Sequence, residues 1–302
     1  MSKDNLRNCP VCDAKAPLET SPVVTANNPA EDCDDVLLQD RFIGFSNEQV
    51  FFSYARCAVC QMLYCPAYFT QTQLDELYES MPDNTAGEEL KHLRRTQRGY
   101  VRRIGKPKKL EGRWLDVGAD IGLLGEQIVS LEPKAIVDAI EPNVAVHGEL
   151  SQRLGPGSRI STSWNEVEDV TYDGVVAIHV LDHLIDLGRD LDSVSGHLRT
   201  GGIFMAVVHN EQSLLRRILG RKWPPFCLQH PHLFSPATLR RALETRGFHV
   251  ESIKRTTNFF TLHHLATVAF PVLGIPKTAA KYLPRILVPL PLGNIEVVAR
   301  KK

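Results

Sequence analysis

A glycine-bearing turn between a strand and a helix constrains the fold of this chain more than any other feature. An apolar run at 114–117 ends in Asp116-Val117 and continues as Gly118-Ala119-Asp120-Ile121-Gly122. Glycine has no Cβ atom, so backbone N–H groups at the start of the following helix can approach a ligand closely. The G-x-G-x-x-G pattern typical of dinucleotide folds is absent. The segment therefore predicts a ligand-binding turn at the carboxyl end of a buried strand.

Apolar runs alternate with helical patterns throughout the chain after Pro107. The expected strands are Trp114–Val117, Ala135–Ile140, Ser158–Thr162, Gly174–Val180, Gly202–Val208, His249–Ile253 and Ile295–Ala299. The expected helices are Leu123–Leu131, Val144–Leu154, Leu187–Leu198 and Pro236–Arg246. Strands that are apolar throughout are typical of a parallel sheet buried on both faces. The alternation predicts a doubly wound α/β domain.

The second expected strand ends in an acidic residue, Glu141, 25 residues after Asp116. A carboxylate at that strand tip can accept hydrogen bonds from both ribose hydroxyls of an adenosine. Together with the glycine turn, Glu141 predicts a nucleoside-bearing cofactor at this edge of the sheet.

Five motifs in sequence order make the segment 114–248 resemble a class I S-adenosylmethionine-dependent methyltransferase. They are the D-x-G-x-G-x-G turn on Asp116, Gly118 and Gly122, the acidic Glu141, the stretch His179-Val180-Leu181-Asp182-His183-Leu184, the turn Leu198-Arg199-Thr200-Gly201-Gly202, and the element from His232-Leu233-Phe234-Ser235-Pro236 to Gly247-Phe248. The resemblance implies a Rossmann-like seven-stranded methyltransferase sheet over 111–302, with S-adenosylmethionine as cofactor. It implies that Asp116, Gly118, Gly122 and Glu141 bind that cofactor.

Asp120 departs from the family pattern, because it stands where the middle glycine usually lies. A carboxylate there could contact the ammonium group of the cofactor, or it could cap the next helix. Trp164 follows the third expected strand and is either a flank for the adenine or a core residue. His179 ends the fourth strand and is expected beside the cofactor.

Histidines follow the strand ends where the acceptor of the methyl group is expected to bind. Methyl transfer to a hydroxyl or carbon requires removal of a proton. His183, after the fourth strand, is the predicted base, and Asp182 is a second predicted catalytic residue that could pair with it. A structural hydrogen-bonding role is the alternative for the histidine. His209, His230 and His232 are predicted substrate-binding residues, and the Pro-rich aromatic stretch 222–232 is an expected lid.

Four of the seven cysteines form two C-x-x-C pairs, Cys9/Cys12 and Cys57/Cys60. Two such pairs can supply the four thiolates of a closed structural Zn²⁺ site. Cys33, Cys65 and Cys227 are expected not to be ligands. Residues 1–88 are therefore predicted to form a small zinc-binding module, similar to modules that precede the methyltransferase domain in sugar and natural-product tailoring enzymes. The alternative is that the cysteines are ordinary buried residues.

Formal charge is balanced over the whole chain, with 35 basic and 35 acidic side chains, but not locally. Residues 1–90 carry 5 basic and 15 acidic residues, whereas residues 91–113 carry 10 basic and 1 acidic. The basic excess falls on a predicted amphipathic helix, Leu90–Ile104, in a linker at 89–110. It could pair with the acidic module or attract an anionic acceptor.

Three functions fit these features. The first is methyl transfer to a small molecule such as a sugar, nucleotide-sugar or secondary metabolite. The second is an RNA methyltransferase with a zinc module, although the balanced charge makes a nucleic-acid partner unlikely. The third is a cofactor-binding scaffold without catalysis. No signal peptide or spanning segment is expected, which predicts a cytoplasmic protein. The apolar stretch 259–292 could form a homodimer contact, a membrane-surface contact or a wall of the acceptor site.

Overall fold

The computed structural model describes residues 6–16, 22–42, 49–79, 90–105, 110–272 and 275–302. Within them lies a seven-stranded sheet with strand order β11-β14-β9-β8-β5-β6-β7. Its members are β5 (Arg113–Val117), β6 (Ile136–Ile140), β7 (Ile160–Ser161), β8 (Tyr172–Ile178), β9 (Leu198–His209), β11 (Phe248–Arg255) and β14 (Asn294–Lys301). The α/β architecture predicted from the alternating pattern is confirmed, with all seven strands in the same sheet.

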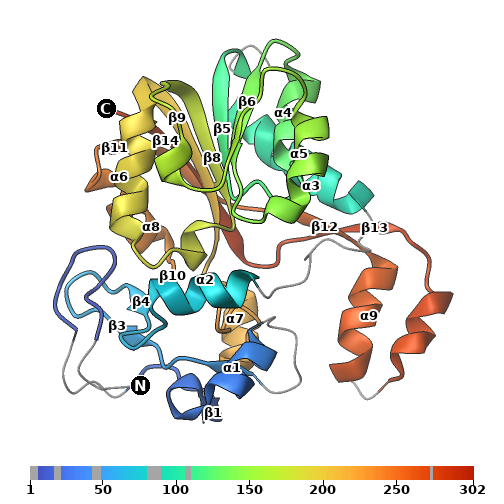
Figure 1. The fold of residues 1–302 in the computed structure, drawn as a ribbon. Coiled ribbons are helices and arrows are strands. Elements are labelled where there is room, and N and C mark those ends of the chain that lie inside the picture. The colour runs from blue at the N-terminus through green and yellow to red at the C-terminus, as the bar shows by residue number, and fades with distance from the viewer. Residues whose placement is uncertain (1–5, 17–21, 43–48, 80–89, 106–109, 273–274) are drawn as a thin grey trace.

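The five strands from β9 to β7 are parallel, and β14 runs antiparallel to both β9 and β11. The central strands have apolar side chains on both faces, as in Val175 and Val176, each fully buried. Helices cover both faces of the sheet (Figure 1). They are α4 (Leu123–Leu131), α5 (His147–Leu154), α6 (Leu187–His197) and α8 (Pro236–Glu244), with the one-turn helices η3 (Val144–Val146), η4 (Trp164–Glu166) and η5 (Leu181–His183). A buried sheet between helices accounts for the uninterrupted apolar runs in the sequence.

The turn expected before the fifth strand is part of that strand. β9 begins at Leu198, four residues earlier than predicted, and the ladder shifts register between Tyr172 and Gly174 of β8. Gly201 has a φ of 74°, so the irregular stretch uses a glycine where the backbone is left-handed.

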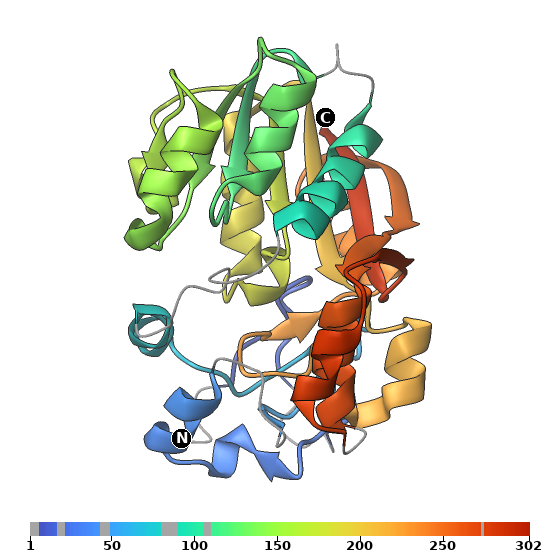
Figure 2. The same ribbon diagram turned by 90° about the vertical axis from the view of Figure 1, so that its right-hand side faces the viewer.

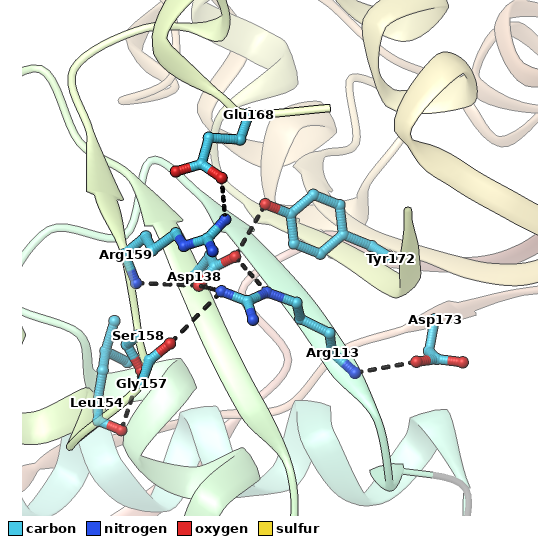
Figure 3. Close-up of polar contacts among 9 residues, drawn as sticks. All are labelled: Arg113, Asp138, Leu154, Gly157, Ser158, Arg159, Glu168, Tyr172 and Asp173. Atoms are coloured by element: carbon cyan, nitrogen blue, oxygen red, sulfur yellow. Dashed lines mark hydrogen bonds and ion pairs between the residues drawn. The ribbon is translucent and has the colours of Figure 1, made fainter. Parts of the chain in front are cut away.

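A polar network ties three strands together at the ends opposite to the glycine turn (Figure 3). Asp138 of β6 is buried and accepts two hydrogen bonds of 2.7 Å from the guanidinium of Arg113 in β5. It also accepts bonds from the Tyr172 hydroxyl (3.0 Å) and from the Arg159 backbone (2.9 Å). Because its partners compensate the buried charge, Asp138 holds β5, β6 and β8 in register.

The N-terminal part of the chain is built from short elements. They are β1 (Asn28–Pro29), η1 (Ala30–Asp32), α1 (Asp35–Arg41), β2 (Val50–Phe51), β3 (Ala55–Arg56), β4 (Leu63–Tyr64) and α2 (Gln71–Glu79). In Figures 1 and 2 this part, in blue to cyan, lies against one end of the large sheet. β4 pairs with β3 on one side and with β10 (His232–Leu233) on the other. N-terminal residues therefore share a sheet with the chain segment that carries the predicted acceptor-binding histidines.

The linker helix α3 (Leu90–Ile104) lies on the side of the molecule that holds the large sheet. Arg94 pairs with Glu126 (2.9 Å), Arg103 pairs with the buried Glu296 (2.9 Å), and the Arg95 guanidinium lies 4.5 Å from the centre of the Phe259 ring. Among the residues that the structure describes, these basic side chains thus pair with residues after 110 rather than with the acidic N-terminal part.

The apolar stretch after Thr256 forms an arm beside the sheet (Figure 1). β12 (Asn258–Thr261) and β13 (Leu287–Leu290) form a hairpin-like pair, with α9 (Leu262–Val272) and η7 (Lys277–Tyr282) between them. The remaining elements are α7 (Leu214–Leu219) and η6 (Gly220–Lys222). Within the described ranges, every helix is too short or too polar to cross a bilayer.

Candidate active site

The glycine turn has a backbone that only glycine can adopt without strain at two positions. Gly118 and Gly122 have φ values of 67° and 81°. A Cβ on Gly118 would lie 2.5 Å from a methyl carbon of Val180, and a Cβ on Gly122 would lie 2.7 Å from one of Leu150. Both glycines are therefore needed for the close packing of the turn.

Glu141 braces this turn from the end of β6. Its carboxylate accepts hydrogen bonds from the backbone N–H groups of Asp120 (2.7 Å) and Asn143 (2.9 Å). Glu141 is only 9% exposed. Each carboxylate oxygen has a second lone pair, so Glu141 can still accept bonds from a pair of hydroxyls.

Asp116 and Asp120 add two more carboxylates to the turn. Asp116 is buried, and one of its oxygens has no hydrogen-bond partner among the described residues. Burial, with Glu141 and Asp120 nearby, raises its pKa to about 8. Asp120 has a left-handed backbone (φ 48°), which is uncommon outside glycine. The residue that caps α4 is Gly122, not Asp120. An unsatisfied buried oxygen beside a strained turn fits a site built to receive a polar ligand.

Trp164 lies farther along the same sheet edge. Its ring is half-buried and stacks on His197 of α6, with ring centres 5.5 Å apart. Its indole also interacts with Asp190. The structure therefore gives Trp164 protein partners on α6.

Asp182 contacts His209 and not its sequence neighbour His183. One oxygen of the fully buried Asp182 accepts hydrogen bonds from the Nδ1 and the backbone N–H of His209, both 2.9 Å. The other oxygen has no partner in the described part of the chain. Burial raises the pKa of Asp182 to about 6, and burial beside His230 lowers the pKa of His209 well below its usual value. Above pH 6, the pair is an ionised carboxylate and a neutral imidazole.

Three more histidines gather around this pair. The ring centre of His209 lies 4.8 Å from that of His179 and 4.9 Å from that of His230, and His230 lies 4.6 Å from His183. Burial, with His209 nearby, lowers the pKa of His179 to about 3. Burial lowers the pKa of His183 well below its usual value and also lowers that of His230. These rings are neutral at pH 7.

His232 lies at the rim of this cluster. It is fully buried in β10 and hydrogen-bonds the Leu181 carbonyl through Nε2 (2.8 Å). The predicted substrate-binding histidines His209 and His230 are thus brought together, whereas His232 faces η5.

Three further residues lie near the cluster, and two of them, Tyr78 and Asn294, were not anticipated from the sequence. The Tyr78 hydroxyl lies 3.2 Å from His183 Nδ1, the Asn294 amide lies 3.4 Å from His179 Nε2, and Trp223 meets His209 edge-on at 6.3 Å. Trp223 belongs to the aromatic stretch expected as a lid. Tyr78 and Asn294 come from distant elements with no local signal.

The four paired cysteines converge on one point. The sulfurs of Cys9 and Cys60 lie 3.4 Å apart, those of Cys12 and Cys57 lie 3.6 Å apart, and all four lie within 4.8 Å of one another. Tetrahedral zinc with Zn–S bonds of about 2.3 Å places sulfurs about 3.8 Å apart. The donor set therefore has the composition and spacing for zinc.

The two cysteine turns are also alike in backbone geometry. Asp13 and Gln61, which follow the second cysteine of each pair, are both left-handed (φ 55° and 65°) and both donate to the first cysteine's carbonyl at 2.9 Å. Hydrogen bonds from Val59 and Cys60 are among the causes that lower the pKa of Cys57 to about 7 despite its burial. Matched turns that favour a thiolate fit metal binding.

A second group of possible donors lies at the histidine cluster. Atoms of His179, Asp182 and His209 fall within 4.8 Å of one another. The direct hydrogen bond between Asp182 and His209 already accounts for the closest of these contacts. An acid–base pair therefore explains this geometry without a metal ion.

A family model described as a methyltransferase domain matches residues 90–253. The ubiquinone biosynthesis O-methyltransferase of Methylocella silvestris is 30% identical over 151 residues, which cover 45% of this chain and 58% of that protein. The chain thus aligns with less than two thirds of that relative's length.

Two solved structures are similar in fold. One is a chain of the complex between the Haloferax volcanii Trm112 methyltransferase activator and its methyltransferase, with a TM-score of 0.52, 14% identity, and coverage of 73% of this chain and 99% of that one. The other is the magnesium protoporphyrin IX methyltransferase of Synechocystis PCC 6803 with bound SAH, with a TM-score of 0.48, 13% identity, and coverage of 78% and 90%. The family model spans more than half of this chain. The chain therefore belongs to the class I methyltransferase domain family, which uses S-adenosylmethionine.

Proposed function

We propose that this chain transfers a methyl group from S-adenosylmethionine to a hydroxyl of a small molecule, with His209 as the general base. The observation that carries the proposal is the 2.9 Å hydrogen bond from His209 Nδ1 to the buried Asp182 carboxylate. Both residues lie at the same sheet edge as the glycine turn, after β8 and at the end of β9. Ligands of open α/β sheets bind at that edge.

The tautomer of His209 follows from its partner. An ionised Asp182 only accepts, so the ring proton is on Nδ1 and the lone pair is on Nε2. Nε2 can then take the proton of an acceptor hydroxyl, and Asp182 stabilises the imidazolium that results. His183, the base expected from the sequence, has both ring nitrogens in contacts, with Tyr78 and with His230. His209 is therefore the better candidate, and His183 is assigned a supporting role.

The cofactor would be held by the turn and its neighbours. Glu141 would accept from the ribose hydroxyls, and the backbone at Gly118 and Gly122 would lie against the cofactor. Asp116, Asp120, Trp164 and His179 complete the proposed cofactor-binding set. When bound, S-adenosylmethionine supplies an electrophilic methyl group on a sulfonium.

The cluster around the base favours an uncharged acceptor. The titratable groups beside His209, His183 and Asp182 in the described structure are one another, His179, His230 and His232, the Tyr78 hydroxyl and the Cys227 thiol, whereas the cation Arg7 acts on His232. Neutral rings do not compensate a phosphate. A hydroxylated sugar or secondary metabolite therefore fits better than a nucleotide-sugar or a nucleic acid. O-methyl transfer also agrees with the name of the Methylocella silvestris relative, an O-methyltransferase.

We further propose that residues 1–88 form a module that binds one structural Zn²⁺ through Cys9, Cys12, Cys57 and Cys60. The linker is 89–110 and the methyltransferase domain is 111–302. The spacing of the sulfurs and the two matched turns support the zinc assignment.

The test of the function is twofold. Binding of S-adenosylhomocysteine is measured by calorimetry, and transfer of tritiated methyl is measured on a panel of phenolic, sugar and nucleotide-sugar acceptors. Glu141→Ala should abolish binding and transfer, whereas Glu149→Ala, an exposed glutamate on α5, should change neither. Binding of S-adenosylhomocysteine without transfer to any acceptor would favour the scaffold alternative, and absence of binding by the unaltered chain would overturn the proposed function.

A further inference from the structure

A chain of hydrogen bonds leads from α2 in the N-terminal part to His230, the ring that packs beside the base. The Tyr78 hydroxyl lies 3.2 Å from His183 Nδ1, and His183 Nε2 lies 3.2 Å from His230 Nε2. His230 Nδ1 lies 2.7 Å from the Pro225 carbonyl, with the Cys227 sulfur 3.3 Å away. The His230 ring in turn packs beside His209, with ring centres 4.9 Å apart.

The proton positions in this series of hydrogen bonds can be assigned from its last acceptor, the Pro225 carbonyl. A carbonyl oxygen only accepts, so His230 carries its proton on Nδ1 and has its lone pair on Nε2. His183 must then donate from Nε2, which leaves its Nδ1 to accept from the Tyr78 hydroxyl. With both rings neutral, this is the arrangement in which every close contact has one donor and one acceptor.

The backbone that carries His230 is held by the same N-terminal part. The Tyr54 hydroxyl donates to the His230 carbonyl (2.6 Å), the Tyr68 hydroxyl donates to the Leu228 carbonyl (2.6 Å), and the Cys65 N–H donates to the Pro231 carbonyl (2.9 Å). Tyr54 and Tyr68 are buried. Side chain and backbone of His230 are thus both positioned by residues that precede the methyltransferase domain.

We propose that Tyr78 and His183 are positioning residues that lock His230 as a single neutral tautomer against the His209 base. Through them, methyl transfer depends on the N-terminal part of the chain, whereas cofactor binding does not. This inference rests on the proposed function for its kinetic consequence, but its structural content can be measured without an acceptor.

The physical benefit is control of charge beside the base. His230 faces His183, His209 and Asp182, and His183 also faces His179 and His232. A proton on His230 would repel the imidazolium that forms on His209 during the reaction and so weaken the base. The lock prevents this, because both nitrogens of His230 are already engaged in its neutral form.

The test uses the full chain labelled with ¹⁵N at histidine and saturated with S-adenosylhomocysteine. Two-bond ¹H–¹⁵N correlation spectra report the tautomer and charge of each ring, with His183→Gln and His230→Gln used for assignment. The expected result is an Nδ1–H form for His230 and an Nε2–H form for His183, unchanged from pH 8 to pH 5.5. A His230 ring that titrates near pH 6.5 in the unaltered chain would overturn the proposal.

Tyr78→Phe removes the hydroxyl that donates to His183 and keeps the aromatic ring. Tyr78 is 39% exposed and packs edge-on against Phe42 at 5.1 Å, so phenylalanine preserves its packing without burying an unpaired group. We expect the His183 Nδ1 resonance to shift, His230 to show mixed tautomers, and the S-adenosylhomocysteine Kd to change less than twofold. The matched control is Tyr282→Phe, on a tyrosine that is 79% exposed in η7. Identical histidine spectra in Tyr78→Phe and the control would contradict the lock.

Kinetics with any acceptor found in the panel distinguish a positioning role of Tyr78 and His183 from a purely structural one. Tyr78→Phe should lower kcat about tenfold with little change in the cofactor KM, and should shift the acid limb of the pH profile upward. His183→Gln, whose amide can still donate to His230, should retain more activity than His183→Leu. Equal losses in these two variants, or a kcat unaffected by Tyr78→Phe, would reject the positioning role even if the chain proves to be a methyltransferase.

Discussion

Asp182 and His209 are 27 residues apart in the sequence, yet the Asp182 carboxylate accepts both the ring and the backbone N–H of His209 at 2.9 Å. The backbone bond fixes where the carboxylate lies, and the ring bond fixes the tautomer. The Asp182 carboxylate thus fixes both the position of the base and which ring nitrogen of the base carries the proton.

Replacement of Asp182 by Asn tests this relationship. The neutral amide would not stabilise an imidazolium and could not fix the tautomer through both contacts. We expect kcat to fall by about 100-fold or more, the scale of general acid–base effects, with S-adenosylhomocysteine affinity unchanged by calorimetry. Asp192→Asn, which alters an exposed carboxylate paired with Arg246, is the control and should keep full activity. A normal kcat in Asp182→Asn would remove His209 from the role of base.

The glycine turn can be tested with a pair of alanine substitutions. Gly118 and Gly155 both have positive φ, 67° and 80°, but only Gly118 would place its new Cβ against another side chain, 2.5 Å from Val180. Both substitutions should cost about 1 kcal/mol in the free energy of unfolding from backbone strain. Gly118→Ala should in addition weaken S-adenosylhomocysteine binding at least tenfold. If both variants bind equally well, the close packing at Gly118 is not needed for the cofactor.

The proposed zinc site predicts a metal content of one zinc per chain. Cys12→Ser should abolish it and destabilise the N-terminal part, because binding energy at such a site is also folding energy. Cys33→Ser is the control, since its sulfur lies outside the four-cysteine group and contacts the Pro29 carbonyl. Mass spectrometry for metals and thermal unfolding report the two effects. If the purified chain lacks zinc and Cys12→Ser is equally stable, these cysteines are ordinary buried residues.

The elements with strong local signals could be predicted from the sequence. The expected helices Leu90–Ile104 and Leu123–Leu131 match α3 and α4, because their apolar residues recur at helical spacing and their ends carry clear breakers. The central strands were recognisable since burial on both faces makes them apolar throughout. The helix expected from Pro236 begins there, where Ser235 forms a capping box with Thr238.

Contacts between distant segments could not be predicted from the sequence. The partner of Asp182 depends on the register of β9 beside β8, which no local pattern specifies. Tyr78 gave no signal, because its role depends on where α2 lies relative to η5. β12 and β13 were also missed, since their apolar residues lie in one long apolar stretch with no period of its own. The matching C-x-x-C pairs were informative for the opposite reason, because their repeated spacing is a local signal, and their four sulfurs do lie within 4.8 Å of one another.

The network around Asp138 should affect stability without affecting the site. Asp138→Asn leaves the Arg113 guanidinium with a weaker partner in a mostly buried position, and such losses cost about 3 kcal/mol. S-adenosylhomocysteine affinity should stay within twofold, because the network lies at the other end of the strands (Figure 3). The comparison is Glu168→Gln, which breaks the exposed pair with Arg159 and should cost less than about 1 kcal/mol. Urea unfolding of both variants measures the difference, and equal stability in the two would show that Asp138 contributes no more than a surface pair.

His179 should make the chain less stable in acid. Burial, with His209 nearby, lowers its pKa in the folded chain to about 3, from an ordinary value of 6.5. Between these values the unfolded chain binds a proton that the folded chain does not, so this contribution is complete above pH 6.5 and is lost as the pH falls. From pH 7.5 to pH 5.0, the loss attributable to His179 is about 2 kcal/mol. His179→Gln should therefore shrink the difference in unfolding free energy between these two pH values by that amount, as measured by urea titration. His249→Gln, on an exposed histidine of β11, is the comparison variant. The same pH dependence in His179→Gln as in the unaltered chain would mean that His179 takes up its proton in the folded state, and that its ring is open to water.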